Sequence, residues 1–205
     1  MPRITPSDRR EAILDAAREE FSRNGFARAR MDDIAGRVGI SKAALYLQFD
    51  SKEAIFYALA EGLIAETIPV LVPAEFGDVP AAMLLRGFVT MALERLTRSD
   101  IAFVPRLVIG EGGSFPDLVR YYHDHAIIRI MELIEAVIRH GVDRGEFSCA
   151  DPYHTARSVA GGVILSALWR VVFEPVGARP LDVAAMTEAH VSVLIDGLLI
   201  REEKP

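Results

Sequence analysis

The sequence of 205 residues contains a single cysteine, Cys149. One cysteine excludes a disulfide within the chain and suits a reducing cytoplasm, where we expect the protein to reside. Apolar runs are expected to fall short of the roughly 18 residues that a membrane span needs, because a serine interrupts VAGGVILSALW and Arg170 follows it. The chain opens directly on a charged helical pattern, which predicts no signal peptide. We therefore expect no membrane partner.

Alternating polar and apolar residues, the mark of β-strands, are almost absent, which predicts an all-α fold. Apolar residues recur at helical spacing between clusters of proline and glycine, and 51% of the chain is hydrophobic, enough for a sizeable core. Six helices are predicted after residue 51, over residues 52–68, 79–98, 100–110, 116–140, 151–173 and 180–201.

Residues 30–52 form the most informative segment. One face of its first predicted helix is apolar, formed by Met31, Ile34, Ala35 and Val38. Gly39 ends that helix, and Ser41 is a good N-cap for a second helix from Lys42 to about Phe49. Two helices joined by so tight a turn cross steeply, as in a helix-turn-helix, where the second helix enters the major groove of DNA. Ser51 is expected to cap the helix that follows.

A helical hairpin without DNA is the alternative for these two helices alone. The upstream segment favours the DNA-binding interpretation, because it predicts a third helix with Thr5 as its cap, Pro6 in its first turn and Asn24-Gly25 as its end. The apolar face of that helix comprises Ile13, Leu14, Ala17 and Phe21. Three such helices can bury a small core together.

The sequence resembles the tetracycline-repressor (TetR) family of bacterial transcription regulators over its first quarter. The resemblance lies in Phe21, Gly25-Phe26, Ile34-Ala35, Gly39, Ser41-Lys42, Leu45-Tyr46, Phe49 and Ser51-Lys52-Glu53. It implies a three-helix DNA-binding domain over residues 1–51 and a larger helical ligand-binding and dimerisation domain over 52–205. It also implies a repressor released from a palindromic operator by a small molecule. The DNA contacts that we expect are Arg30, Ser41, Lys42, Ala43, Ala44, Tyr46, Gln48 and Lys52, with Tyr46 and Lys52 on phosphates.

Four residues depart from the family pattern. Ala29 and Arg30 replace the usual threonines before the first motif helix, Ala43 replaces a common glycine, and Gln48 replaces tyrosine or histidine. The hydroxyl contact to a phosphate is therefore missing, and Arg30 can replace it with a stronger, charge-assisted bond. Gln48 can pair with adenine or contact only phosphate, so the base preference stays open.

The charge distribution agrees with DNA binding at the N-terminal end. Residues 1–52 carry ten lysines or arginines against eight acids, whereas the whole chain has a net charge of −6. An acidic protein repels DNA except where basic groups gather. A solvated surface produces such a contrast too, so we treat it only as support.

The last two predicted helices are apolar on two sides, which predicts burial against more than their own domain. Either they form a hairpin inside a monomer, or they pair with a second copy in a four-helix bundle, as the resemblance implies. The expected dimer interface comprises Gly161, Gly162, Leu165, Val191, Leu194, Ile195 and Leu198. A symmetric dimer matches a palindromic DNA site.

The middle helices surround an effector pocket in the resembled family. We expect an apolar or aromatic effector, bound by Phe88, Met91, Phe103, Arg106, Tyr122, Ser166 and Trp169. The bland alternative is that the large residues are core and the polar ones are solvated.

No catalytic centre, cofactor site or metal site is expected. The segment FVPRLVIGEGGSFPDLV lacks the third glycine of a dinucleotide fingerprint and the glycine of a hydrolase elbow. His123 and His125 are two residues apart, so a helix directs them to nearly opposite sides. The alternative class is a small-molecule-binding helical protein or enzyme without specific DNA binding. The effector, the operator, the regulated genes and the direction of regulation cannot be predicted from the sequence.

Overall fold

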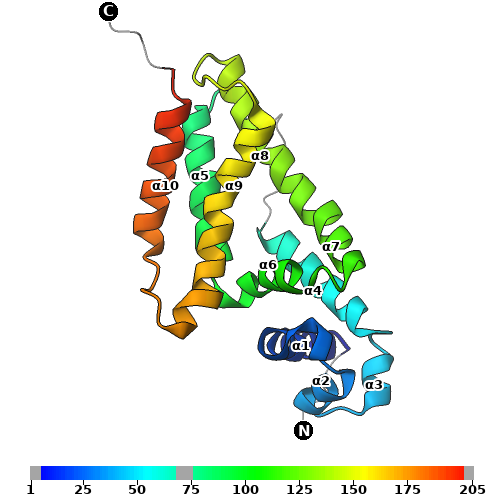
Figure 1. Ribbon diagram of the computed structural model, residues 1–205. Helices are drawn as coiled ribbons and strands as arrows, with labels where there is room; N and C mark the ends of the chain where they lie inside the picture. The colour runs from blue at the N-terminus through cyan, green and yellow to red at the C-terminus, as the bar shows by residue number, and fades with distance from the viewer. Residues whose placement is uncertain (1–5, 68–75, 201–205) are drawn as a thin grey trace, which may run out of the picture. The chain divides into compact units, whose positions relative to one another are not determined.

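The computed structural model describes residues 6–67 and 76–200, which form helices joined by short turns and loops (Figure 1). The elements are α1 (Pro6–Arg28), α2 (Met31–Val38), α3 (Lys42–Tyr46), α4 (Lys52–Thr67), α5 (Ala81–Leu96), α6 (Ser99–Glu111), α7 (Pro116–Tyr122), η2 (His123–Ile127), α8 (Ile128–Asp143), α9 (Pro152–Leu168), η3 (Trp169–Phe173), η4 (Glu174–Val176) and α10 (Val183–Leu198). Over the described ranges the only β-type pairing is an isolated bridge between Phe147 and Leu199. The all-α prediction is confirmed.

The predicted helices agree with these bounds to within a few residues, with three differences. α3 ends at Tyr46 instead of Phe49, because the Gln48 N–H turns back to the Leu45 carbonyl at 2.9 Å. The predicted helices 116–140 and 151–173 each contain a π-helical turn, η2 and η3, that no spacing pattern indicated. Thr5, the expected cap of the first helix, lies outside the described residues.

The chain forms two compact units, and each is made of two separate stretches of sequence. Residues 1–66 and 103–125 form one unit, and residues 67–102 and 126–205 form the other. The chain passes from one unit to the other within α6. The expected division at residues 51 and 52 concerns function, and it stays a prediction.

The first unit has an aromatic core around the end of α1. Phe26 lies 5.3 Å from Phe21, 5.8 Å from Phe56 and 4.9 Å from Phe115, measured between ring centres. Most of the expected apolar faces of α1 and α2 are buried here, with Leu14 and Val38 only half-buried, and Leu45 adds the inner side of α3. Short helices gain most of their stability from such packing, because α2 and α3 are too short to form alone.

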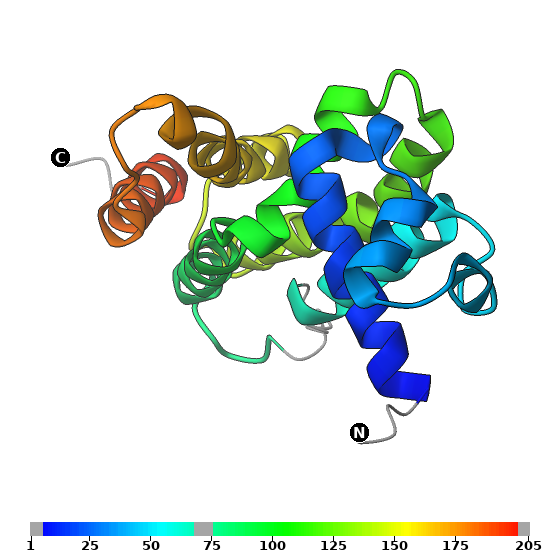
Figure 2. The same ribbon diagram turned by 90° about the horizontal axis from the view of Figure 1, so that it is seen from below.

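The second unit is a bundle in which α5, α8, α9 and α10 run side by side (Figures 1 and 2). The helix starts follow local rules, since the carboxylates of Asp151 and Asp182 accept hydrogen bonds from His154 N and Ala185 N at the N-termini of α9 and α10. The buried core of the bundle comprises Phe76, Ala81, Leu85, Val89, Leu93, Leu133, Ile134, Val137, Ile138, Phe147, Ala156, Val159, Val163, Val191 and Leu198.

Candidate nucleic-acid interface

The turn between α2 and α3 has the geometry that the sequence predicted. Gly39 adopts φ 73° and ψ 30°, a left-handed conformation that ends α2 and favours glycine. The Ile40 N–H then donates to the Ala35 carbonyl at 3.1 Å. Ser41 Oγ accepts a hydrogen bond from Ala44 N at 3.1 Å, so it caps α3 as expected. Backbone and cap together fix the direction in which α3 leaves α2.

The outer side of α3 is open to solvent. Tyr46 is 42% exposed and Leu47 is 84% exposed, which is high for large side chains of a folded domain. Lys42, Ala43 and Ser41 are exposed as well, whereas Ala44 and Gln48 are half-buried. Arg30 is exposed at the N-terminus of α2, where it makes no capping hydrogen bond. These side chains are accessible to a macromolecular partner.

Lys42 is joined to α2 by an ion pair. Its Nζ lies 2.8 Å from Asp32 Oδ1. The hydrogen bond that Lys42 donates to Asp32, and then the negative charge of Asp32, raise the pKa of Lys42 above its usual value of 10.5. The lysine is therefore a fixed positive charge at the start of α3.

Lys52 forms hydrogen bonds within the chain. Its Nζ donates to the carbonyl oxygens of Phe26 at 2.8 Å, Ala27 at 3.2 Å and Ala29 at 3.5 Å. An ammonium group has three donors, and these bonds occupy them within the chain. Lys52 therefore has a structural role at the end of α1, and its expected phosphate contact stays a prediction. Ser51 Oγ caps α4 by accepting from Ala54 N at 3.2 Å, as expected.

A buried ion pair between α1 and α2 was missed by the sequence analysis. Glu20 is 1% exposed, and its carboxylate accepts from Arg37 Nε at 3.0 Å and from the Asn24 side chain. Arg37 also lies 3.3 Å from Glu19. The guanidinium of Arg37 is thus used to hold the two helices together. Glu20 and Arg37 are 17 residues apart, so no local spacing pattern indicates the ion pair. The only signal in the sequence is that Glu20 lies beside the apolar face of α1.

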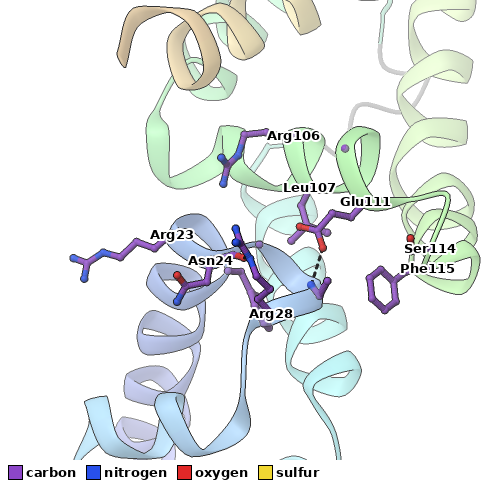
Figure 3. Close-up of a pocket in the computed structure, with 12 residues that line it drawn as sticks. Arg23, Asn24, Arg28, Arg106, Leu107, Glu111, Ser114 and Phe115 are labelled. Atoms are coloured by element: carbon purple, nitrogen blue, oxygen red, sulfur yellow. Dashed lines mark hydrogen bonds between the residues drawn. The ribbon is translucent and has the colours of Figure 1, made fainter. Parts of the chain in front are cut away.

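A pocket of about 450 Å³ lies between the end of α1 and α6 in the first unit (Figure 3). Its lining residues are Phe21, Arg23, Asn24, Gly25, Ala27, Arg28, Arg106, Leu107, Gly110, Glu111, Ser114 and Phe115. Figure 3 shows the Glu111 carboxylate directed at the end of α1, where its two oxygens accept from Phe26 N at 2.9 Å and Ala27 N at 2.7 Å. The sequence did not predict that Glu111 and Gly25 lie together.

The expected effector-binding residues are divided between the two units. Phe103, Arg106 and Tyr122 belong to the first unit, and the second contains Phe88, Met91, Ser166 and Trp169. Several polar groups among them have partners in the chain: Ser166 Oγ donates to the Gly162 carbonyl, and Trp169 Nε1 to that of Arg179. Burial raises the pKa of Tyr122 to about 12, so its phenol stays neutral. A pocket walled by these seven residues stays a prediction.

Two residues of the expected dimer interface lie in the core of their own chain. Val191 is 0% exposed and Leu198 is 6% exposed, and both lie in the core of the bundle. They are seven residues apart, which places them on one face of α10, and that face packs inside the chain. The assignment of Val191 and Leu198 to a dimer interface is therefore corrected.

The glycine pair on α9 also divides into two roles. A Cβ on Gly162 would lie 2.5 Å from the His190 ring, so Gly162 allows α9 and α10 to approach within one chain. Gly161 and Leu165 are exposed, with Leu165 at 58%, whereas Leu194 and Ile195 are half-buried. Val193, which the sequence analysis did not select, is 71% exposed on α10.

The segment Pro152–Val176 is long and apolar enough to cross a membrane by length and composition alone. The expectation that this segment falls short was therefore wrong. In the structure it contributes Ala156, Val159 and Val163 to the bundle core. Only 22% of its most apolar window is buried inside the chain.

Among the described residues, no group of three or more histidine, cysteine or acidic side chains is arranged to hold a metal ion. His123 Nδ1 pairs with Asp124 at 2.8 Å, and His125 Nδ1 lies 2.8 Å from the Tyr121 carbonyl. The two rings have separate partners.

The fold and the turn at Gly39 define a helix-turn-helix protein whose second helix is exposed. Comparison with protein-family models agrees over most of the chain. Residues 13–59 match the model of the bacterial regulatory proteins, tetR family, and residues 83–195 match that of the AefR-like transcriptional repressor, C-terminal domain. The chain belongs to the TetR family and is a DNA-binding transcriptional regulator.

Individual proteins are similar to the chain in sequence or in fold. The chain is 26% identical over 199 residues to the HTH-type transcriptional repressor KstR2 of Rhodococcus jostii, covering 94% of this chain and 92% of that protein. A TetR family regulator from Pseudomonas syringae pv. tomato superposes with a TM-score of 0.74 at 25% identity, covering 96% of this chain and 100% of the other. Bacillus subtilis FadR, solved in complex with stearoyl-CoA, superposes with a TM-score of 0.73 at 20% identity, covering 91% and 98%.

Proposed function

We propose that the protein is a homodimeric repressor that binds a palindromic operator through α3 and leaves it when a small molecule binds. The observation that carries this proposal is the capped turn from Gly39 to Ser41, which presents the exposed side of α3. In a helix-turn-helix the second helix enters the major groove and the first crosses the backbone. We also propose that the protein acts in the cytoplasm, because a DNA-binding regulator must have access to DNA.

The exposed residues of this region supply suitable chemistry. Tyr46 offers a phenol for a phosphate oxygen, and Arg30 offers a guanidinium that matches phosphate with two donors. Lys42 adds a charge, and Gln48 is the candidate for pairing with adenine. Ser41, Ala43 and Ala44 line the same helix and would approach the groove closely. Lys52 is left out, because its donors are used within the chain.

A second copy of the chain is the proposed partner of α9 and α10. Leu165 and Val193 are large apolar side chains that remain exposed in a single chain. Such surfaces are enriched at interfaces, and a two-fold axis through them would relate two copies of α3. We propose an interface of Gly161, Leu165, Val193, Leu194 and Ile195. A two-fold dimer places its half-sites about one helical turn of DNA apart, or a multiple of it.

The proposed effector has a long apolar or aromatic part. Support comes from the apolar lining expected of Phe88, Met91 and Trp169, and from FadR of Bacillus subtilis, which is similar in fold and was solved with stearoyl-CoA. A ligand that binds better to the conformation with misplaced α3 helices weakens DNA binding by its differential affinity.

Binding-site selection from random duplex DNA with the full chain tests the proposal. We expect enrichment of a palindrome and its retention in a gel shift at low salt. Adding stearoyl-CoA, or hydrophobic fractions of a cell extract, should release the DNA, with stearic acid and free coenzyme A as controls. No enrichment of any sequence would contradict operator binding, and it would favour a small-molecule-binding protein or enzyme without specific DNA binding. Unchanged operator affinity with every compound shown to bind would contradict the release mechanism.

A further inference from the structure

The hydrogen-bond ladder of α1 is broken before the helix ends. Gly25 adopts φ 74° and ψ 167°, which is far from helical values. In an uninterrupted helix, the N–H of Phe26 would donate to the carbonyl of Ser22, four residues earlier. The break at Gly25 separates these two groups, and Phe26 is fully buried. A buried polar group without a partner costs free energy, so both groups need a new one.

One helix supplies both replacements. Glu111 of α6 accepts from Phe26 N and Ala27 N, using one carboxylate oxygen for each. Arg106, also on α6, donates from its guanidinium to the Ser22 carbonyl at 2.5 Å. The donor and the acceptor that the break leaves without partners are thus both bonded to α6. The residues involved are 84 or 85 positions apart in the sequence.

The Glu111 carboxylate lies directly against the backbone at Gly25, where α1 is broken. A Cβ on residue 25 would lie 2.3 Å from Glu111 Oε1, and the positive φ already disfavours side chains. Glycine is therefore needed at this position twice, for its backbone conformation and for the space that Glu111 occupies. In Figure 3 the Glu111 carboxylate lies between α6 and the end of α1.

The break sets the path of the chain into the helix-turn-helix. Only three residues, Phe26 to Arg28, remain of α1 beyond Gly25, and α2 begins at Met31. The carbonyls of Phe26 and Ala27 are bonded to Lys52, while their N–H groups are bonded to Glu111. Both sides of this short segment are therefore fixed by charged groups.

We propose that Glu111 and Arg106 are positioning residues for DNA binding. They hold the break in α1 and thereby the direction in which α2 and α3 leave it, without contacting DNA themselves. The proposal rests on DNA binding through α3. It assigns a role to two α6 residues, one of which, Arg106, was expected to bind the effector.

The test compares full-length Glu111→Gln, Glu111→Ala and Arg106→Ala with the wild type and with Glu94→Gln. Glu94 is an exposed acid of α5, so its variant controls for the change in charge. Each protein is titrated with the duplex selected by the wild type and with a random-sequence duplex, over a range of salt. Hydrogen exchange of the peptide that contains Phe26 and Ala27 reports the bonds directly.

Glu111→Ala should weaken binding to the selected duplex by about tenfold or more, because two charge-assisted hydrogen bonds are lost. Glu111→Gln keeps one acceptor and should show a smaller loss. The salt slope should stay unchanged, since no phosphate contact is removed. Exchange at Phe26 and Ala27 should accelerate while the remainder of the chain stays protected, which a general loss of stability would not produce.

Wild-type affinity for the selected duplex in folded Glu111→Ala would overturn the proposal. If Glu111→Ala does not fold, Glu111→Gln decides by the same criterion, with wild-type affinity again overturning it. An equal loss in Glu94→Gln would also overturn it, because charge alone would then explain the effect. Failure of the wild type to retain any duplex would instead remove DNA binding, and this proposal with it.

Discussion

The ammonium group of Lys52, at the start of α4, donates to the Phe26 carbonyl at 2.8 Å and lies 4.6 Å from the centre of the Phe26 ring. One side chain thus satisfies carbonyls left open at the end of α1 and makes a cation–π contact with a core aromatic. This position explains why a lysine that the sequence suggested for DNA serves the interior of the first unit.

Replacing Lys52 with methionine should therefore act on stability. The variant keeps the aliphatic chain but removes a charged donor, which should lower the free energy of unfolding by about 1.5–3 kcal/mol. Chemical denaturation measures the change, and Lys42→Met, which removes only the exposed ion pair with Asp32, should change the stability less. If instead the variant kept its stability and the salt slope of DNA binding fell by about one unit, Lys52 would be shown to contact a phosphate.

Tyr46 should behave in the opposite way. Its side chain is 42% exposed, so Tyr46→Ala should leave the unfolding free energy within about 0.5 kcal/mol of the wild type. The same change should weaken binding to all duplex sequences, because phosphate contacts carry no base information. Tyr46→Phe tests the hydroxyl alone. Tyr153→Ala, at an exposed position of α9, is the matched control, and equal DNA affinity in all four proteins would rule out the contact.

Leu165→Glu and Val193→Glu should each convert the proposed dimer to a monomer. Burying a carboxylate in an apolar interface is costly, whereas neither side chain is buried in the single chain. Sedimentation velocity measures the mass, and circular dichroism shows whether the helices persist. Met83→Glu, at an exposed position of α5, should leave the oligomeric state unchanged. A wild type that is monomeric at all concentrations would contradict the dimer outright.

Gly162→Ala should destabilise the bundle. The added Cβ would lie 2.5 Å from the His190 ring, and moving that ring breaks its contact with the Val159 carbonyl at 2.9 Å. Overpacking of this kind costs about 1–3 kcal/mol. Gly87→Ala in α5 meets nothing within 4 Å and should be neutral or stabilising, by up to about 1 kcal/mol. Equal thermal midpoints in the two variants would show that α9 and α10 tolerate a wider separation.

The sequence by itself determined the local features of this protein. Apolar spacing located the helices, and Gly39, Ser41 and Ser51 ended or capped them as predicted, because these effects act over a few residues. The family resemblance in the first quarter of the chain rests on the same local pattern, and the family models confirm it.

Only the tertiary structure decided which side chains meet. Spacing placed Val191 and Leu198 on an apolar face of α10, but it did not show whether that face met the chain's own core or a partner. Likewise, a break at Gly25 was predictable from glycine, whereas its bonds to Glu111 join residues 85 positions apart. Periodicity reports which way a side chain points within its helix. The packing of distant helices decides what lies in that direction.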